Sequence, residues 1–145
     1  MKVLFVCTGN SCRSVMASYY LKKRLKDLGI KNVEVLSAGT AVVPGMSASS
    51  EVIEIFKREG IDVTSHYSKG LSKAMIESCD LIFVMSQNHL NEVIRRVPNA
   101  KTKVFLLNKE DIPDPINGTM RDYENCFNLI KKCIEDNVIP KLGVL

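Results

Sequence analysis

Two residues near the start of the chain have side chains suited to covalent chemistry on an anion. Cys7 and Arg13 are separated by a short polar segment that reads Thr-Gly-Asn-Ser-Cys. A cysteine beside a cation at a helix N-terminus is a thiolate at neutral pH, and the thiolate is the nucleophilic form. The planar guanidinium of an arginine can hold two oxygens of an oxyanion at once. The pair therefore predicts a nucleophile next to an oxyanion-binding group.

Two neighbours of this pair are expected to assist it. Ser14 follows Arg13 directly, and its hydroxyl is expected to donate a hydrogen bond to the sulfur of Cys7, which favours the thiolate. Gly9 is expected to adopt a positive φ where the segment bends, because glycine has no Cβ to clash there.

The elements around these residues predict how they are positioned. Residues 2–6 read Lys-Val-Leu-Phe-Val, an apolar run typical of a buried strand. From Ser14 onward the apolar residues recur at helical spacing, at Ala17, Leu21, Leu25 and Leu28. A strand, a loop of small residues and a helix in this order form an anion site, because the loop N–H groups and the helix N-terminus converge.

The rest of the chain alternates between strand-like and helix-like segments. We expect further strands at residues 33–36, 80–85 and 104–107, and further helices at about 48–59, 71–78, 88–97 and 121–138. This alternation predicts an α/β fold: a single domain over residues 1–145, with a four-stranded parallel sheet, helices on both faces and the anion-binding loop after the first strand. Ligands of such sheets bind beyond the carboxyl ends of the strands.

Composition narrows the partners and the cellular compartment. The net charge of +4 suits attraction of a dianionic phosphate but is too small for a nucleic-acid footprint, so we expect no nucleic acid. No apolar run approaches membrane-spanning length and no signal-peptide pattern is present, so we expect no membrane association and a cytoplasmic location. The five cysteines form neither an even disulfide framework nor a zinc-ligand spacing, which argues against disulfides and against a zinc site; we expect no cofactor. Cys126 and Cys133 lie on an apolar helical face and are expected to be core residues.

Two segments of the chain resemble characteristic segments of one enzyme family. The segment from Cys7 to Ser14, with its Cys-x5-Arg-Ser spacing after a short strand, resembles the phosphate-binding loop of the low-molecular-weight protein tyrosine phosphatases. Far along the chain, the segment 111–115 reads Asp-Ile-Pro-Asp-Pro and resembles the Asp-Pro loop that carries the general acid of that family. The resemblance extends over nearly the whole chain, because segments 37–40, 64–66 and 78–81 also match.

The resemblance implies a two-step mechanism without a metal. Cys7 attacks phosphorus, Asp114 protonates the leaving oxygen, and water activated by Asp114 then hydrolyses the cysteinyl-phosphate. Asp111 is a competing candidate for the general acid, although no proline follows it. The phosphate-binding residues are implied to be Thr8, Gly9, Asn10, Ser11, Cys12 and Arg13.

The resemblance also implies supporting residues. Asn10, Ser37 and His66 match a hydrogen-bonded set that holds the loop in shape, alongside Ser14, so His66 is expected to be structural. Cys12 matches a second loop cysteine that can form a reversible disulfide with Cys7. For His89 we expect a surface position or a satisfied core position.

The substrate is expected to be a phosphorylated protein or peptide, with inorganic phosphate as a product. We favour phosphotyrosine. Protein-arginine phosphatase activity is the alternative, because the related arginine phosphatases have threonine where this chain has the small, hydroxylated Ser11. A thiol-dependent arsenate reductase needs resolving cysteines after the third strand, where this chain has Ser86. A non-enzymatic phosphate-binding module is disfavoured by the presence of both Cys7 and Asp114.

Overall fold

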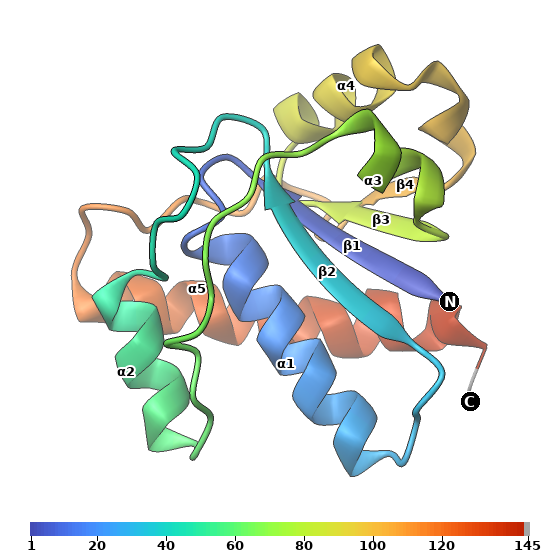
Figure 1. Cartoon of the computed structure of the whole chain (residues 1–145). Coiled ribbons are helices and arrows are strands. Elements are labelled where there is room, and N and C mark those ends of the chain that lie inside the picture. The colour runs from blue at the N-terminus through green and yellow to red at the C-terminus, as the bar shows by residue number, and fades with distance from the viewer. Residues whose placement is uncertain (144–145) are drawn as a thin grey trace.

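The computed structural model describes residues 1–143 and contains one parallel β-sheet (Figure 1). Its four strands follow the spatial order β2-β1-β3-β4. Their bounds are Lys2–Cys7 for β1, Glu34–Gly39 for β2, Leu81–Val84 for β3 and Val104–Leu106 for β4. The predicted strand number and parallel arrangement are confirmed, and β1 lies between two neighbours, where both of its edges are paired.

Helices cover both faces of the sheet, as the sequence predicted (Figure 1). Helices α1, α2 and α5 lie on one side, and α3 and α4 lie on the other. Their bounds are Arg13–Asp27 for α1, Ser50–Arg58 for α2, Lys73–Ser78 for α3, Gln87–Arg96 for α4 and Met120–Cys133 for α5. Short turns of 3-10 helix at Pro98–Thr102 and Ile139–Leu142 and a π-helical turn at Ile134–Val138 complete the elements.

The sheet separates two hydrophobic cores. Side chains of β1 alternate between them: Val3 and Phe5 pack with α1 and α5, whereas Leu4 and Val6 pack on the side of α3 and α4. All four of these side chains are fully buried. A strand that is apolar on both faces is typical of a parallel sheet that is covered on both sides.

Helix α5 begins with a capping box that fixes the end of the preceding loop. The Thr119 hydroxyl accepts a hydrogen bond from the Asp122 N–H at 3.2 Å, and the Asp122 carboxylate accepts one from the Thr119 N–H at 2.9 Å. Reciprocal bonds of this kind satisfy two N–H groups at a helix start. The loop of residues 107–119 is thus held at one end by β4 and at the other by this cap.

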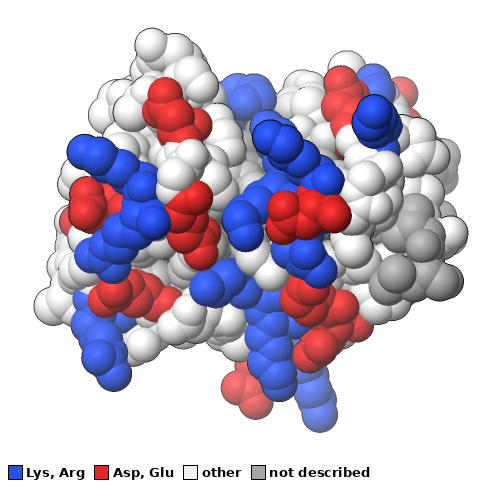
Figure 2. Space-filling model, turned by 90° about the horizontal axis from the view of Figure 1, so that it is seen from below, with Lys and Arg blue, Asp and Glu red and all other residues white. Residues whose placement is uncertain are grey.

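Acidic and basic side chains are interspersed over the face seen in Figure 2. Ion pairs connect the helices on the same side of the sheet: Arg24 of α1 pairs with Glu135 at 3.1 Å, and Arg58 of α2 pairs with Glu124 of α5 at 2.7 Å. Within residues 1–143, no helix combines the length and the apolar character that a membrane crossing requires.

Candidate active site

The loop between β1 and α1 is held from outside through its carbonyl groups. The Thr40 N–H donates to the carbonyl of Cys7 at 2.9 Å, and the Ala41 N–H donates to that of Thr8 at 3.0 Å. The Ser49 N–H donates to the carbonyl of Ser11 at 3.0 Å. Segments that follow β2 therefore clamp the loop along much of its length.

The N–H groups of the same loop have no such partners. Between Thr8 and Cys12, no backbone N–H group donates a hydrogen bond to another described residue. Helix α1 begins at Arg13 without a side-chain cap and without an acidic residue in its first turn. Unused N–H groups beside an uncapped helix N-terminus form a concave site that attracts anions.

Asn10 provides the bend of the loop. Its φ is 54°, in the left-handed region, whereas Gly9 does not have a positive φ, so the prediction for Gly9 was wrong. Asparagine tolerates this conformation better than most residues, and here its side chain is also used. Its amide donates to Ser14 Oγ at 2.8 Å and to Ser37 Oγ at 3.0 Å, and its Oδ1 accepts from the Lys69 N–H at 3.0 Å. A glycine could not make these bonds.

His66 holds the same residue through the backbone. Its Nε2 lies 2.8 Å from the carbonyl oxygen of Asn10, and its side chain is buried. Burial lowers the pKa of His66, and the nearby Lys69 and Lys22 lower it further, although the bond to Asn10 acts in the opposite direction. The structure thus brings together Ser14, Asn10, Ser37 and His66, the four residues predicted to support the loop.

Cys7 stands at the end of β1 with its sulfur 2.9 Å from Ser14 Oγ. Because Ser14 Oγ already accepts a hydrogen bond from the amide of Asn10, its own hydrogen is free to be donated to the sulfur. A hydroxyl donor stabilises a thiolate relative to the thiol. This is the contact that the sequence predicted.

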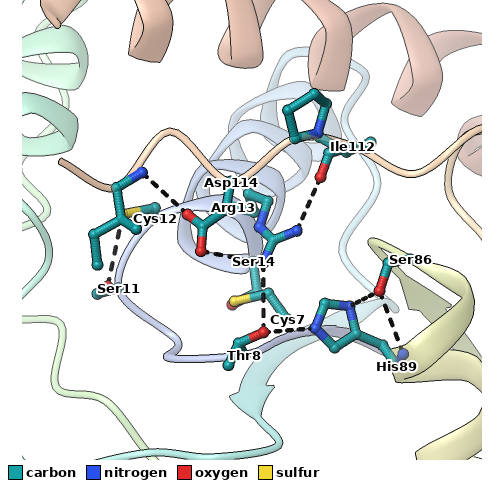
Figure 3. Close-up of polar contacts among 12 residues, drawn as sticks. Cys7, Thr8, Ser11, Cys12, Arg13, Ser14, Ser86, His89, Ile112 and Asp114 are labelled. Carbon is teal, nitrogen blue, oxygen red and sulfur yellow. Dashed lines mark hydrogen bonds and ion pairs between the residues drawn. The ribbon is translucent and has the colours of Figure 1, made fainter. Parts of the chain in front are cut away.

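Arg13 connects the loop to the segment near residue 112 (Figure 3). Its Nη1 donates to the carbonyl oxygen of Ile112 at 2.9 Å, and its Nη2 lies 3.4 Å from Asp114 Oδ2. Nη2 also lies 3.5 Å from Thr8 Oγ1, at the outer limit of a hydrogen bond. The guanidinium is almost completely buried, so these contacts restrict its orientation.

Of the two acidic residues of the Asp-Pro segment, Asp114 lies over the loop. It contacts Arg13, its side chain is 40% exposed, and its Oδ1 accepts from the Ile116 N–H at 3.1 Å. Asp111 instead accepts a hydrogen bond from the Gln87 N–H at 2.9 Å, at the start of α4. The geometry therefore places Asp114, rather than Asp111, beside the arginine and the cysteine.

A cavity of about 240 Å³ lies between the loop and Asp114. Two apolar side chains, Ala41 and Ile116, form part of its wall. The other lining residues are Cys7, Thr8, Gly9, Ser11, Cys12, Arg13 and Asp114, all of them predicted site residues. Asn10 is the predicted phosphate-binding residue that does not line it, because its side chain is fully buried behind the loop.

His89 lies next to the loop, a position that sequence reasoning missed. It is buried and satisfied, as expected for a core histidine, but its Nε2 lies 2.8 Å from Thr8 Oγ1. A groove of about 500 Å³ borders His89, Thr8 and Arg13. One signal was available: His89 falls in the first turn of the helix that follows β3, and that turn lies at the same sheet edge as the loop.

Cys12 and the remaining cysteines carry no disulfide. All five cysteines are free and buried. Cys12 Sγ lies 2.8 Å from Ser49 Oγ and 3.7 Å from the Tyr123 hydroxyl. Cys126 and Cys133 belong to the core, as predicted. Among residues 1–143, no group of three His, Cys, Asp or Glu side chains is arranged to hold a metal ion.

Comparisons with known proteins agree with this arrangement. The model of the low molecular weight phosphotyrosine protein phosphatase family matches residues 2–139. The low molecular weight protein-tyrosine-phosphatase Ptp of Acinetobacter johnsonii is 36% identical over 92% of this chain and 93% of its own. A protein-arginine-phosphatase of Geobacillus stearothermophilus is 35% identical over 97% of this chain and 95% of its own.

A solved structure extends the similarity to the fold. The YwlE arginine phosphatase, in a cysteine-to-serine mutant with a phosphorylated active-site serine, superposes with a TM-score of 0.91 at 27% identity. The match covers 99% of this chain and 97% of that chain.

Proposed function

Because this chain belongs to the low molecular weight phosphotyrosine protein phosphatase family, we propose that it hydrolyses phosphoryl groups on protein side chains with Cys7 as the nucleophile. One observation carries the proposal. Cys7, Arg13 and Asp114 all line one cavity, and the N–H groups of the loop between Thr8 and Cys12 donate to no other described residue. The phosphorylated active-site serine of the similar arginine phosphatase mutant supports a covalent intermediate at the corresponding side chain.

In the first step, the thiolate of Cys7 attacks phosphorus and the bond from phosphorus to the leaving group breaks. The loop N–H groups and Arg13 hold the equatorial oxygens, where negative charge is concentrated in the transition state. Asp114 gives its proton to the leaving atom.

In the second step, Asp114 accepts a proton from water while the water oxygen bonds to phosphorus. The sulfur–phosphorus bond breaks, inorganic phosphate leaves, and Cys7 returns to the thiolate. The Ser14 hydroxyl stabilises the departing sulfur through its 2.9 Å contact. The cycle is of the ping-pong type and moves one proton in each direction, so it needs no co-reactant other than water.

We propose phosphotyrosine as the preferred phosphoryl donor. Ala41 and Ile116 provide apolar contacts at the cavity wall that suit an aromatic ring. Phosphoarginine is the second candidate because the hydroxyl of Ser11 lines the same cavity, and because one of the similar proteins is a protein-arginine-phosphatase. A cytoplasmic location belongs to the same proposal, since a free, reduced Cys7 is needed for attack.

Paired kinetics on phosphotyrosine and phosphoarginine peptides test the proposal. We expect turnover of at least one peptide by the wild type and none by Cys7→Ser. Asp114→Asn should lower kcat by about 10²–10⁴-fold, the usual contribution of a general acid. Asp111→Asn is the matched control, with a much smaller loss. Equal losses in the two variants would contradict the assignment of Asp114.

Specificity is tested by Ser11→Ile in the same assays. A bulky aliphatic side chain at this position should lower kcat/KM for phosphoarginine more than for phosphotyrosine. If the wild type prefers phosphoarginine and this variant reverses the preference, the second candidate replaces the first.

A further inference from the structure

His89 is the centre of a hydrogen-bonded chain that ends on Arg13 (Figure 3). Its Nδ1 lies 2.9 Å from Ser86 Oγ, and its Nε2 lies 2.8 Å from Thr8 Oγ1. Thr8 Oγ1 in turn lies 3.5 Å from Arg13 Nη2. The chain therefore runs from the start of α4 across the loop to the guanidinium at the start of α1.

The chain has a direction that follows from the donors available. Ser86 caps α4, so its Oγ accepts a hydrogen bond from the N–H of His89. The hydroxyl hydrogen of Ser86 needs an acceptor, and within residues 1–143 the acceptor in contact with it is Nδ1 of His89. A neutral imidazole has one acceptor and one donor nitrogen, so Nε2 carries the hydrogen and donates to Thr8.

The surroundings of His89 keep the imidazole neutral. Burial lowers its pKa from 6.5 to about 4, and the positive charge of Arg13 acts in the same direction. Asp111 and Asp114 oppose this effect but do not outweigh it. A neutral ring can stand close to the arginine without repelling it, and it retains the single N–H that the direction of the chain requires.

We propose that His89 is a positioning residue that acts on Arg13 through Thr8. Thr8 Oγ1 has two lone pairs: one accepts from His89, and the other faces Arg13 Nη2. With Ile112 accepting from Nη1, the guanidinium is then held at both terminal nitrogens. The hydroxyl hydrogen of Thr8 remains available to a phosphoryl oxygen, because Thr8 lines the cavity that contains Cys7.

The proposal rests on the phosphatase function above and makes a distinct claim about it. A guanidinium that is already oriented binds the phosphoryl oxygens without reorganisation. This stabilises the bound state, and it stabilises the transition state more. Loss of the donor at Nε2 should therefore weaken phosphate binding and also lower kcat. A residue that served only to fill space would affect neither of these more than its effect on folding explains.

The experiment compares two replacements of His89 that differ in their donor. His89→Leu removes the N–H, whereas His89→Gln can present an amide N–H to Thr8. We expect His89→Leu to lower kcat/KM about tenfold and to raise the inhibition constant of inorganic phosphate, which corresponds to the loss of one hydrogen bond in a charged site. His89→Gln should recover most of both values. Gln87→Ala, on the same helical turn but exposed, is the matched control and should leave them within about twofold.

A double mutant and a spectrum complete the test. If His89 acts through Thr8, adding His89→Leu to Thr8→Val should cause no further loss, because the chain is already broken at Thr8. Imidazole ¹⁵N chemical shifts of the wild type should report a hydrogen on Nε2 of His89, and Ser86→Ala should weaken that preference.

Four results would overturn the proposal: kcat/KM of folded His89→Leu within twofold of the wild type, no recovery in His89→Gln, independent losses in the double mutant, or a hydrogen on Nδ1. The spectrum gives an answer even if His89→Leu does not fold. Absence of turnover by the wild type would instead reject the phosphatase function, and calorimetric titration with inorganic phosphate would still test the role of His89.

Discussion

Two buried histidines contact the loop between β1 and α1, and they hold different parts of it. His66 comes from the segment after α2 and binds a backbone carbonyl, that of Asn10. His89 comes from α4 and contacts a side chain, that of Thr8. A bond to the backbone fixes the course of the chain, whereas a bond to a side chain can be passed on to the group that side chain touches. The first histidine is thus suited to shaping the loop and the second to orienting Arg13.

The comparison also separates their consequences for stability and function. Asn10, held by His66, is hydrogen-bonded to Ser14, Ser37 and the Lys69 N–H. A substitution of Asn10 therefore breaks hydrogen bonds to several segments of the chain. The side chain of Thr8 has fewer contacts, to His89 and Arg13. Substitution of His66 or Asn10 should therefore mainly lower the free energy of unfolding. Substitution of His89 or Thr8 should mainly weaken phosphate binding.

The largest effect on stability is expected at Asn10. Asn10→Ala removes three hydrogen bonds and places in the left-handed region a residue that tolerates it less well than asparagine, which together should lower the free energy of unfolding by about 4 kcal/mol. Urea denaturation measures this. Thr8→Val, at the residue that His89 contacts, should lower the free energy of unfolding by only about 1 kcal/mol.

Asn10→Gly serves as the control for the backbone. It loses the same hydrogen bonds but adopts a positive φ without strain, so it should be about 1 kcal/mol more stable than Asn10→Ala. Equal stabilities would show that the left-handed conformation contributes nothing.

The second effect is a dependence of stability on pH. The pKa of His89 is about 4 in the folded chain, against an ordinary value of 6.5, so between these values the unfolded chain binds a proton that the folded chain does not. Stability should therefore fall by up to about 3 kcal/mol as pH drops from 6.5 towards 4. Urea midpoints measured across this range should show it.

His89→Gln should remove most of this pH dependence. The pKa of His66 is also lowered, so His66→Gln should remove a part as well. If neither variant differs from the wild type across this range, carboxylates elsewhere in the chain account for the acid sensitivity.

The third effect separates the two histidines directly. His66→Phe keeps a ring in the same space but leaves the Asn10 carbonyl without its partner, which should lower the free energy of unfolding by about 2 kcal/mol. Its inhibition constant for inorganic phosphate should rise less than that of His89→Leu. If the inhibition constant rises as much as in His89→Leu, at equal stability, the two histidines contribute equally to phosphate binding, which contradicts the distinction between them.

The smallest effect is expected at Ser37, which accepts a single 3.0 Å hydrogen bond from Asn10. Ser37→Ala should cost about 1 kcal/mol in urea denaturation. Ser78→Ala, at an exposed hydroxyl on α3, should change stability by less than about 0.5 kcal/mol. A difference between them below the measurement error would remove Ser37 from the supporting set.

Much of the fold followed from local patterns. The apolar run of residues 2–6 and the helical spacing after Ser14 correctly predicted β1, α1 and the loop between them. Local patterns do not encode the choice between neighbouring residues in a loop, and the positive φ expected at Gly9 belongs to Asn10. The side chain of Asn10 makes three bonds there, and their partners lie far away in the sequence.

The contact of His89 with the loop was missed for a different reason. It depends on the strand order, which places β3 directly beside β1 and so brings the first turn of α4 next to Thr8. Hydrophobic periodicity predicts that strands exist but not which strands are neighbours. His66 was predicted through a family resemblance, which carries tertiary information that a single segment does not.

The hydrogen bond from Arg13 to Ile112 has a consequence for how the protein is made. The two residues are 99 positions apart, so a growing chain contains Cys7, the proposed nucleophile, long before the hydrogen-bond partner of Arg13 exists. Contacts of such long range form late, because a large loop of chain must be closed first. Enzymatic activity should therefore appear only once the last third of the chain has docked, and its recovery would report the completion of refolding rather than the formation of the N-terminal half.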